Sequence, residues 1–269
     1  MLLPEGENDP DASLPLAEAE TEAETETDDV PVEEEDGKGR DDWNSMELIE
    51  MTRKLQPQIL VDDRLDLMDV PGGWDYRTPE QVALREQPTL DGKPVLWETC
   101  QTFSGSWGYH REESTWKSVD QLVRMLIDTV SKGGNLLLNV GPTARGPLDG
   151  RAMDRLAGMG EWMKAHSRSI YGCGPAPAGF KTPQDCRLTY NAETKRMYVH
   201  AYAWPFRALH LDGFAGKVKY AQLLNDASEI PMVGAEHLAR WGVPEDTVVL
   251  GLPVQQPDVA VRVIELYLK

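Results

Sequence analysis

Carboxylates and aromatic side chains gather between residues 74 and 141 of this 269-residue sequence. Glu80 follows a Trp-Asp-Tyr run, Glu98 ends a short apolar run, and Trp107 lies in the loop beyond it. Paired carboxyl groups perform the acid, base and nucleophile steps of glycosidic-bond cleavage, and aromatic faces pack on the C–H surfaces of sugar rings. The stretch therefore predicts a carbohydrate site.

Short apolar runs at 59–61, 95–97 and 136–138 predict strands buried on both faces, the second of them ending at Glu98. Between them, periods of 3.6 residues predict helices that begin near Asn44, Ser118 and Gly150. The first two carry Glu47 or Gln121 in a capping-box relation. The first helix is expected to bury Leu48, Met51, Thr52 and Leu55. This alternation is typical of parallel strands joined by helices.

The pattern changes after residue 171. Residues 172–177 have the Gly and Pro content of a linker, and beyond them the apolar period becomes two, as at 197–204. The runs at 218–220, 248–250 and 259–263 show the same strand-like pattern. Several short strands separated by turn residues predict an antiparallel β-sandwich.

The acidity of the chain is concentrated at its start. The formal net charge is −18, and residues 1–36 hold fifteen Asp and Glu, no Lys or Arg, and no aromatic residue. Such a segment buries too little apolar surface to fold, so we expect disorder, with an acidic interaction tail as the alternative. The remaining surface is nearly neutral, which disfavours nucleic acid as a partner.

Neither a membrane span nor a secretion signal is visible, so the chain as written is expected in the cytoplasm unless its true N-terminus lies elsewhere. Cys100, Cys173 and Cys186 make no disulfide framework or metal knuckle, and the five histidines lack ligand spacing. We therefore expect free thiols and no metal or other cofactor. The sequence leaves the oligomeric state open.

The motifs between residues 43 and 171 resemble those of glycoside hydrolase family 29, the α-L-fucosidases. The similar pieces are Leu55-Gln56-Pro57, Val61-Asp62-Asp63-Arg64, Thr78-Pro79-Glu80-Gln81, Trp97-Glu98, Trp107-Gly108-Tyr109, the Gly133 to Pro142 run, Gly160-Glu161-Trp162 and Ile170-Tyr171. The resemblance covers about 37–269 and implies an exo-hydrolase that releases terminal L-fucose from glycans with retention. In such a mechanism one carboxylate forms a glycosyl-enzyme and a second acts as acid and base, about 5–5.5 Å away.

Each implied site residue has a plainer alternative. Glu80 matches the acid/base, or is a solvated loop carboxylate; Glu98 is the second candidate, or a structural acceptor beneath the site. Arg64 matches a sugar-binding arginine, or pairs with a neighbouring aspartate. Trp107 matches an aromatic against the fucose ring, or belongs to the core. The nucleophile position falls at Asp29, which no apolar run precedes.

The resemblance implies an α/β fold: a partial TIM-type β/α barrel over 37–171, followed by the β-sandwich over 172–269. The barrel is partial because a closed one needs eight strands in about 250 residues, whereas only three strands are predicted here. A truncated, inactive fragment or a carbohydrate-binding remnant is therefore the alternative function, with the acidic segment as non-native sequence. A barrel glycosidase for another sugar is a third possibility.

Overall fold

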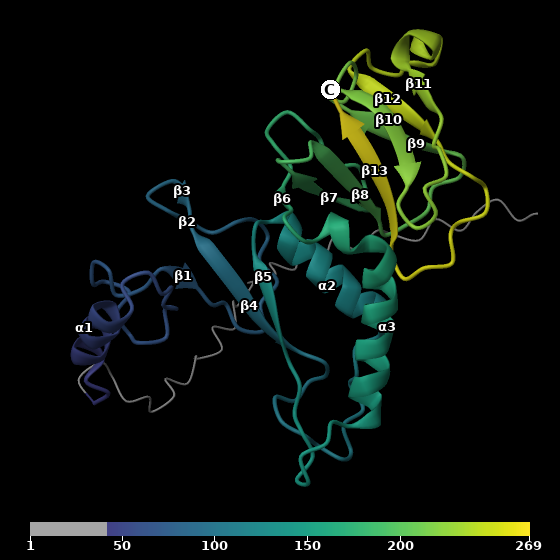
Figure 1. Cartoon of the computed structure of the whole chain (residues 1–269). Coiled ribbons are helices and arrows are strands. Elements are labelled where there is room, and N and C mark those ends of the chain that lie inside the picture. Colours follow the sequence, from purple (N-terminus) through teal and green to yellow (C-terminus); the bar gives the residue numbers. More distant parts are fainter. Residues whose placement is uncertain (1–41) are drawn as a thin grey trace, which may run out of the picture. The chain divides into compact units, whose positions relative to one another are not determined.

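The computed structural model describes residues 42–269 (Figure 1). The acidic segment 1–36, residues 37–41 of the predicted barrel part and the candidate nucleophile Asp29 lie outside these residues. No helix in the described part of the chain is long and apolar enough to cross a membrane.

The first part of the described chain combines helices with a parallel sheet. Its helices are α1 (Ser45–Leu55), α2 (Val119–Ser131), α3 (Gly150–His166) and the 3₁₀ turn η1 (Ser167–Ser169). Its strands are β1 (Tyr76–Arg77), β2 (Thr89–Leu90), β3 (Lys93–Pro94), β4 (Leu96–Thr102) and β5 (Asn135–Asn139). The parallel sheet has the order β1-β4-β5, and β2 and β3 form a separate antiparallel pair. The predicted unit of parallel strands joined by a helix is confirmed for β4, α2 and β5.

Helix α2 begins where its capping box predicts. The Gln121 N–H donates to Ser118 Oγ at 3.1 Å, and the Ser118 N–H donates to Gln121 Oε1 at 2.7 Å. These two bonds satisfy backbone donors that have no partner within the helix. The helix ends before Gly133, whose φ of 76° suits a residue without a Cβ. Its inner face is fully buried at Leu122, Val123 and Ile127.

Helix α1 lies at the predicted place, but two expectations about it are wrong. Asn44 has a left-handed backbone, with φ of 50°, and makes no side-chain capping hydrogen bond. The face that was expected to be buried is exposed at Leu48, Met51 and Leu55, whereas Ile49 is buried. The apolar period marks the helix, but packing against Ile49 decides which side faces inward.

The predicted strand at 59–61 is not formed. Ile59 and Leu60 are exposed and belong to no strand. The regular pairing here is a parallel bridge from Asp62 to Tyr76. Strand β4 is longer than predicted and continues to Thr102, so Glu98 lies within the strand and not at its end.

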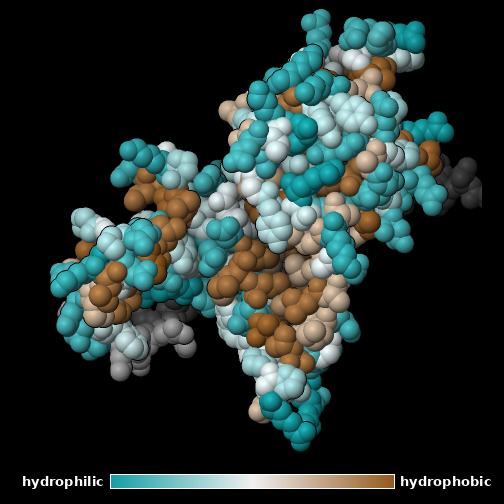
Figure 2. All heavy atoms as spheres, viewed as in Figure 1, coloured by the Kyte–Doolittle hydropathy of each residue, from teal (hydrophilic) through white to brown (hydrophobic). Residues whose placement is uncertain are grey.

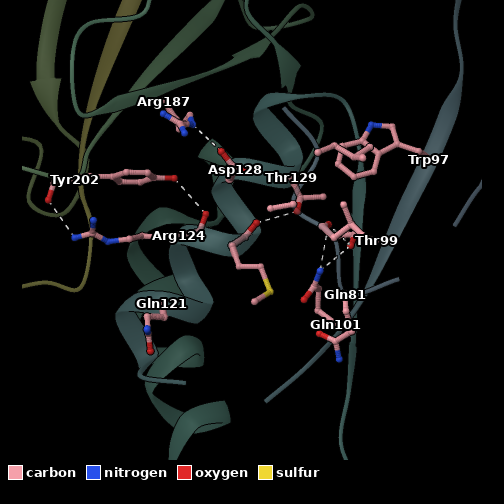
Figure 3. Close-up of a pocket in the computed structure, with 14 residues that line it drawn as sticks. Gln81, Trp97, Thr99, Gln101, Gln121, Arg124, Asp128, Thr129, Arg187 and Tyr202 are labelled. Atoms are coloured by element: carbon pink, nitrogen blue, oxygen red, sulfur yellow. Dashed lines mark hydrogen bonds and ion pairs between the residues drawn. The ribbon is translucent and has the colours of Figure 1, made fainter. Parts of the chain in front are cut away.

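Strand β5 is an edge strand, and the expectation that it is buried on both faces is wrong. Leu137 is 50% exposed, and Figure 2 shows an apolar surface in the region where β5 lies. Residues 42–269 therefore contain an open three-stranded parallel sheet and no closed barrel. One face of this sheet remains accessible, and the candidate site lies on it.

The second part of the chain is an antiparallel β-sandwich, as predicted. Its larger sheet has the order β10-β13-β8-β7-β6 and its smaller sheet the order β11-β12-β9. The larger sheet consists of β6 (Gly174–Pro175), β7 (Cys186–Asn191), β8 (Arg196–Ala201), β10 (Val218–Leu223) and β13 (Arg262–Leu268). The smaller sheet consists of β9 (Ala208–Asp212), β11 (Met232–Gly234) and β12 (Thr247–Gly251), with 3₁₀ turns η2 (Ala235–His237) and η3 (Ala239–Trp241) after β11. Both sheets contribute to one core, for example through Met197, Leu211 and Ile264. Strand β6 lies within the stretch predicted as a linker.

The larger sheet is buried on both faces, because α2 and α3 cover the face opposite the sandwich core. The two helices lie against each other, and α2 also lies against β7 (Figure 1). Trp162 of α3 packs in a cluster with Tyr198 and Val263, and its Nε1 donates to the Val261 carbonyl at 2.8 Å. The helical part and the sandwich therefore share a hydrophobic core.

His200 of β8 is fully buried and should make stability sensitive to acid. Its Nε2 lies 2.9 Å from Thr189 Oγ1, and its Nδ1 has no hydrogen-bond partner. Burial, with a smaller contribution from His166, lowers the pKa of His200 from 6.5 to about 3. The unfolded chain therefore binds the extra proton first as the pH falls. Below pH 6.5 we expect the free energy of unfolding to decrease towards pH 3, by at most about 1.4 kcal/mol per pH unit.

Urea unfolding at pH 7 and pH 4 measures this loss. The His200→Gln variant, which can keep a hydrogen bond to Thr189 but cannot take up a proton, should have a flatter dependence between these pH values. An unchanged dependence in the variant would show that other groups cause the acid sensitivity.

Candidate active site

Glu80 follows β1 by three residues and is held against β4 by backbone hydrogen bonds. Glu80 and Cys100 form a parallel bridge; the Cys100 N–H donates to the Pro79 carbonyl at 3.2 Å, and the Gln81 N–H donates to the Cys100 carbonyl at 3.0 Å. Gln81 has a left-handed φ of 55°, and its Nε2 donates to the buried Thr102 Oγ1 at 3.0 Å. Glu80 is thus fixed near the carboxyl end of a parallel sheet, where enzymes of this architecture carry their reactive groups.

Arg64 contacts Glu80 directly. Its Nη1 lies 2.9 Å from Glu80 Oε2, while Nε and Nη2 donate to Thr78 Oγ1 and O at 2.7 and 2.8 Å. The side chains of Arg64 and Glu80 are 48% and 43% exposed. The structure thus joins two residues that the sequence predicts for one site, and leaves both accessible to a ligand.

The alternative partners of Arg64 do not bind its guanidinium. Asp62 Oδ1 accepts only the Arg64 backbone N–H, at 3.2 Å. Asp63 Oδ1 accepts the Thr78 N–H and hydroxyl at 3.0 and 2.5 Å, and its Oδ2 lies 3.9 Å from Arg77 Nη1. These two aspartates shape the segment behind the ion pair and leave the guanidinium to Glu80 and Thr78.

Glu98 lies on the same face of the sheet as Glu80. It precedes Cys100 by two residues, so both point to one side of β4, about 7 Å apart along the strand. Burial and the charge of Glu80 raise the pKa of the Cys100 thiol, Arg64 lowers it, and Glu98 raises it again. The pKa of the Tyr76 hydroxyl is also raised, first by burial and then by the charges of Asp62 and Glu98. Both carboxylates therefore lie on this face, with Glu98 one pleat below Glu80.

Trp107 is 40% exposed, so it does not belong to the core. Asn139, the last residue of β5, donates from Nδ2 to the Trp107 carbonyl at 2.6 Å. Gly141 permits a close approach of the same loop, because a Cβ there would lie 2.4 Å from the Tyr109 nitrogen and 2.5 Å from the Gly108 carbonyl carbon. The end of β5 thus positions the aromatic loop.

The Glu113 carboxylate fixes the far side of this loop. Glu113 accepts hydrogen bonds from Ser106 Oγ at 2.6 Å and from the Thr115 N–H and hydroxyl at 2.7 and 2.6 Å. Those bonds lower the pKa of Glu113 to about 2, so it is a structural anion at neutral pH. It ties the start of the loop to its end.

The sequence comparison decides the family of this chain. The profile of the α-L-fucosidase family matches residues 21–168, more than half of the chain. The chain belongs to the α-L-fucosidase family. Plasma α-L-fucosidase of Pongo abelii is 32% identical over 173 residues, which are 63% of this chain and 35% of that protein. The α-L-fucosidase of Dictyostelium discoideum is 40% identical over 144 residues, or 49% of this chain and 29% of that protein.

Solved fucosidase structures agree with this assignment. α-L-Fucosidase isoenzyme 1 from Paenibacillus thiaminolyticus superposes with a TM-score of 0.76 at 36% identity, and the match covers 84% of this chain and 54% of that one. Thermotoga maritima α-fucosidase has a TM-score of 0.64 at 25% identity, covering 83% and 48%. The chain therefore spans about a third of the length of the curated fucosidases it matches and about half of these solved ones.

The sequence motifs did not indicate which residues support the candidate site. Gln81, Thr102 and Asn139 hold the segments that carry Glu80 and Trp107. Lys117 Nζ holds the start of the Trp107 loop by donating to the Thr102 and Ser104 carbonyls at 2.7 and 3.2 Å. Gln81 and Asn139 stood inside motifs of the resemblance, but only their contacts reveal what they hold. The position predicted for the nucleophile, Asp29, lies outside residues 42–269.

Removing the Asn139 amide should loosen the Trp107 loop. We expect Asn139→Ala to raise KM for an α-L-fucoside about 3- to 10-fold with a small change in kcat, since one hydrogen bond contributes on the order of 1 kcal/mol. Steady-state kinetics measures the split between KM and kcat. Asn135→Ala, an exposed change at the other end of β5, serves as the control and should leave KM unchanged. Equal effects of the two substitutions would contradict a role for Asn139 in holding the loop.

Proposed function

We propose that this chain forms an α-L-fucosidase site that releases terminal L-fucose from glycans with retention of configuration. The observation that carries the proposal is the Arg64–Glu80 ion pair on the accessible face of the parallel sheet. A carboxyl group and a guanidinium fork in contact are suited to protonating a glycosidic oxygen and binding sugar hydroxyls, respectively. The half-exposed Trp107 adds an apolar surface for the sugar ring.

In this proposal Glu80 is the acid and base. Before substrate binds, its Oε2 lies against Arg64 Nη1. When the guanidinium turns to the sugar oxygens, Glu80 is free to carry the proton that it donates to the leaving oxygen. After the glycosyl-enzyme forms, the Glu80 carboxylate takes a proton from water as the water oxygen attacks the anomeric carbon and the bond to the nucleophile breaks. This step releases fucose and leaves Glu80 protonated for the next cycle. Asp29 is the proposed nucleophile, and Glu98 shapes the floor of the site.

We also propose that strands β1, β4 and β5 are part of a β/α barrel over 37–171, with the sandwich over 172–269 as a second domain. Two features support this arrangement. The three strands are parallel, and the buried side chains of β4, such as Trp97, are on the side opposite the face of Glu80. In a β/α barrel the outer face of the strands meets helices and the carboxyl ends carry the chemistry.

Hydrolysis of 4-nitrophenyl α-L-fucoside by the purified chain tests the proposed function. We expect turnover, loss of turnover in Asp29→Asn, and a decrease in kcat/KM of about 10- to 100-fold in Arg64→Met, as for losing a charge-assisted contact of about 1.5–3 kcal/mol. Arg77→Met is the matched control, because Arg77 carries the same charge at the end of β1 and lies 3.9 Å from Asp63 rather than against Glu80. A folded chain without turnover would favour the carbohydrate-binding remnant.

A further inference from the structure

A groove on the sandwich lies outside the candidate active site. Its volume is about 550 Å³, and it runs between strand β9 and the segments 182–185 and 203–205. Its lining includes Gln184, Asp185, Trp204, His210 and Asp212, and does not include Glu80, Arg64 or Trp107. The volume falls within the range of about 300–1,000 Å³ that is typical of small-molecule sites.

One wall of the groove is the open edge of β9, the outer strand of the smaller sheet. The Leu252 N–H donates to the Arg207 carbonyl and the Gly213 N–H to the Asp246 carbonyl, both at 2.9 Å. In an antiparallel strand, the backbone groups of successive residues point alternately toward and away from the neighbouring strand. Arg207 and Gly213 pair with the β12 side, so the backbone N–H and C=O of His210, three residues from each, point away from β12 and toward the groove. This wall offers both donors and acceptors.

The opposite wall contains a fixed aromatic ring. Trp204 Nε1 donates to the Pro253 carbonyl at 3.0 Å, and part of the ring packs against the sandwich core. The indole is therefore anchored at its polar atom, and Trp204 lines the groove. A rigid aromatic surface loses little conformational entropy when a ligand packs on it.

Two carboxylates complete the lining. Asp212 Oδ1 accepts the Thr247 hydroxyl at 2.8 Å, which holds the carboxylate in place. Asp185 has a left-handed φ of 54° next to the Gln184 amide. None of the residues lining this groove is a lysine or an arginine. Carboxylates bind adjacent hydroxyl groups well, whereas an anionic ligand would be repelled.

We propose that this groove binds a neutral sugar unit of a glycan, separately from the catalytic site. The Asp185 and Asp212 carboxylates, an amide and an imidazole match the hydroxyl groups of a pyranose ring, and the Trp204 ring matches its C–H face. An extended peptide added to β9 fits less well, because the open edge is only five residues long and half of its backbone groups already pair with β12. The identity of the glycan as fucosylated rests on the proposed function, but binding of a sugar does not.

NMR titration of the full ¹⁵N-labelled chain with fucosyllactose and with lactose tests the proposal. The Glu80→Gln background slows turnover, and Trp204→Phe assigns the indole signal. We expect both sugars to shift the Trp204 indole signal with a Kd in the millimolar range. Asp185→Asn combined with His210→Ala should weaken this binding at least fivefold, whereas Arg64→Met should leave it unchanged.

The opposite pattern would overturn the proposal. Sugars that leave the Trp204 signal unmoved in a folded chain show that the groove is not a sugar site. The same conclusion follows if an extended lysine-containing peptide, and no sugar, shifts the β9 amide signals. Hydrolysis is measured separately, so sugar binding at Trp204 by a chain without turnover would overturn the proposed function alone.

Discussion

Replacing Glu80 by glutamine is expected to abolish most hydrolysis of fucosyllactose, by about 10²- to 10⁴-fold in kcat, because the amide can neither give nor take a proton. The loss should be smaller for 4-nitrophenyl α-L-fucoside, whose phenolate departs with little protonation. Steady-state kinetics on both substrates measures the difference. This dependence on the leaving group separates an acid/base from a residue that only binds the sugar.

Glu98→Gln is the matched control for this prediction. Glu98 lies on the same face of the sheet, one pleat below, and should affect the two substrates equally and more weakly. Azide supplies a second control, since a small nucleophile that needs no base should restore turnover of the aryl fucoside in Glu80→Gln. A larger loss in Glu98→Gln, with dependence on the leaving group, would assign the acid/base to Glu98.

Truncating Trp162 to alanine should destabilise the chain by about 3–5 kcal/mol, as for other buried aromatic side chains. Trp162 is 4% exposed, stacks on His166 at a centroid distance of 4.8 Å, and donates to the Val261 carbonyl. It therefore joins α3 to the sandwich through both packing and a hydrogen bond. Urea unfolding followed by circular dichroism measures the free energy of unfolding.

Trp162→Phe separates the two contributions, because it keeps most of the packing but leaves the Val261 carbonyl without its donor. We expect a loss smaller than in Trp162→Ala. Two separate unfolding transitions in the parent chain would contradict a shared core, since helices and sandwich would then unfold independently.

The sequence predicted elements best where local chemistry decides them. The Ser118 and Gln121 capping box fixed the start of α2, and the period of two beyond residue 171 identified the sandwich strands. Burial was predicted less well, since it depends on neighbours that are distant in sequence. Leu137 and Leu60 look like core residues in a one-dimensional pattern, yet both are exposed: β5 is an edge strand of the described sheet, and Leu60 lies in no strand.

The candidate site was predicted in part. The motifs pointed to Glu80, Arg64 and Trp107, and the structure adds that the first two are in contact. The supporting contacts could not be predicted, because Gln81 and Thr102 are twenty-one residues apart and Asn139 and Trp107 thirty-two. Such pairs meet only through the register of parallel strands, which local patterns do not specify.

¹H NMR of fucose release from an aryl α-L-fucoside by the purified chain shows which anomer forms first. A site in which Glu80 is the acid and base of a double displacement predicts that α-L-fucose forms first and equilibrates later with the β anomer. First formation of β-L-fucose, or no release of fucose by the folded chain, would contradict the account.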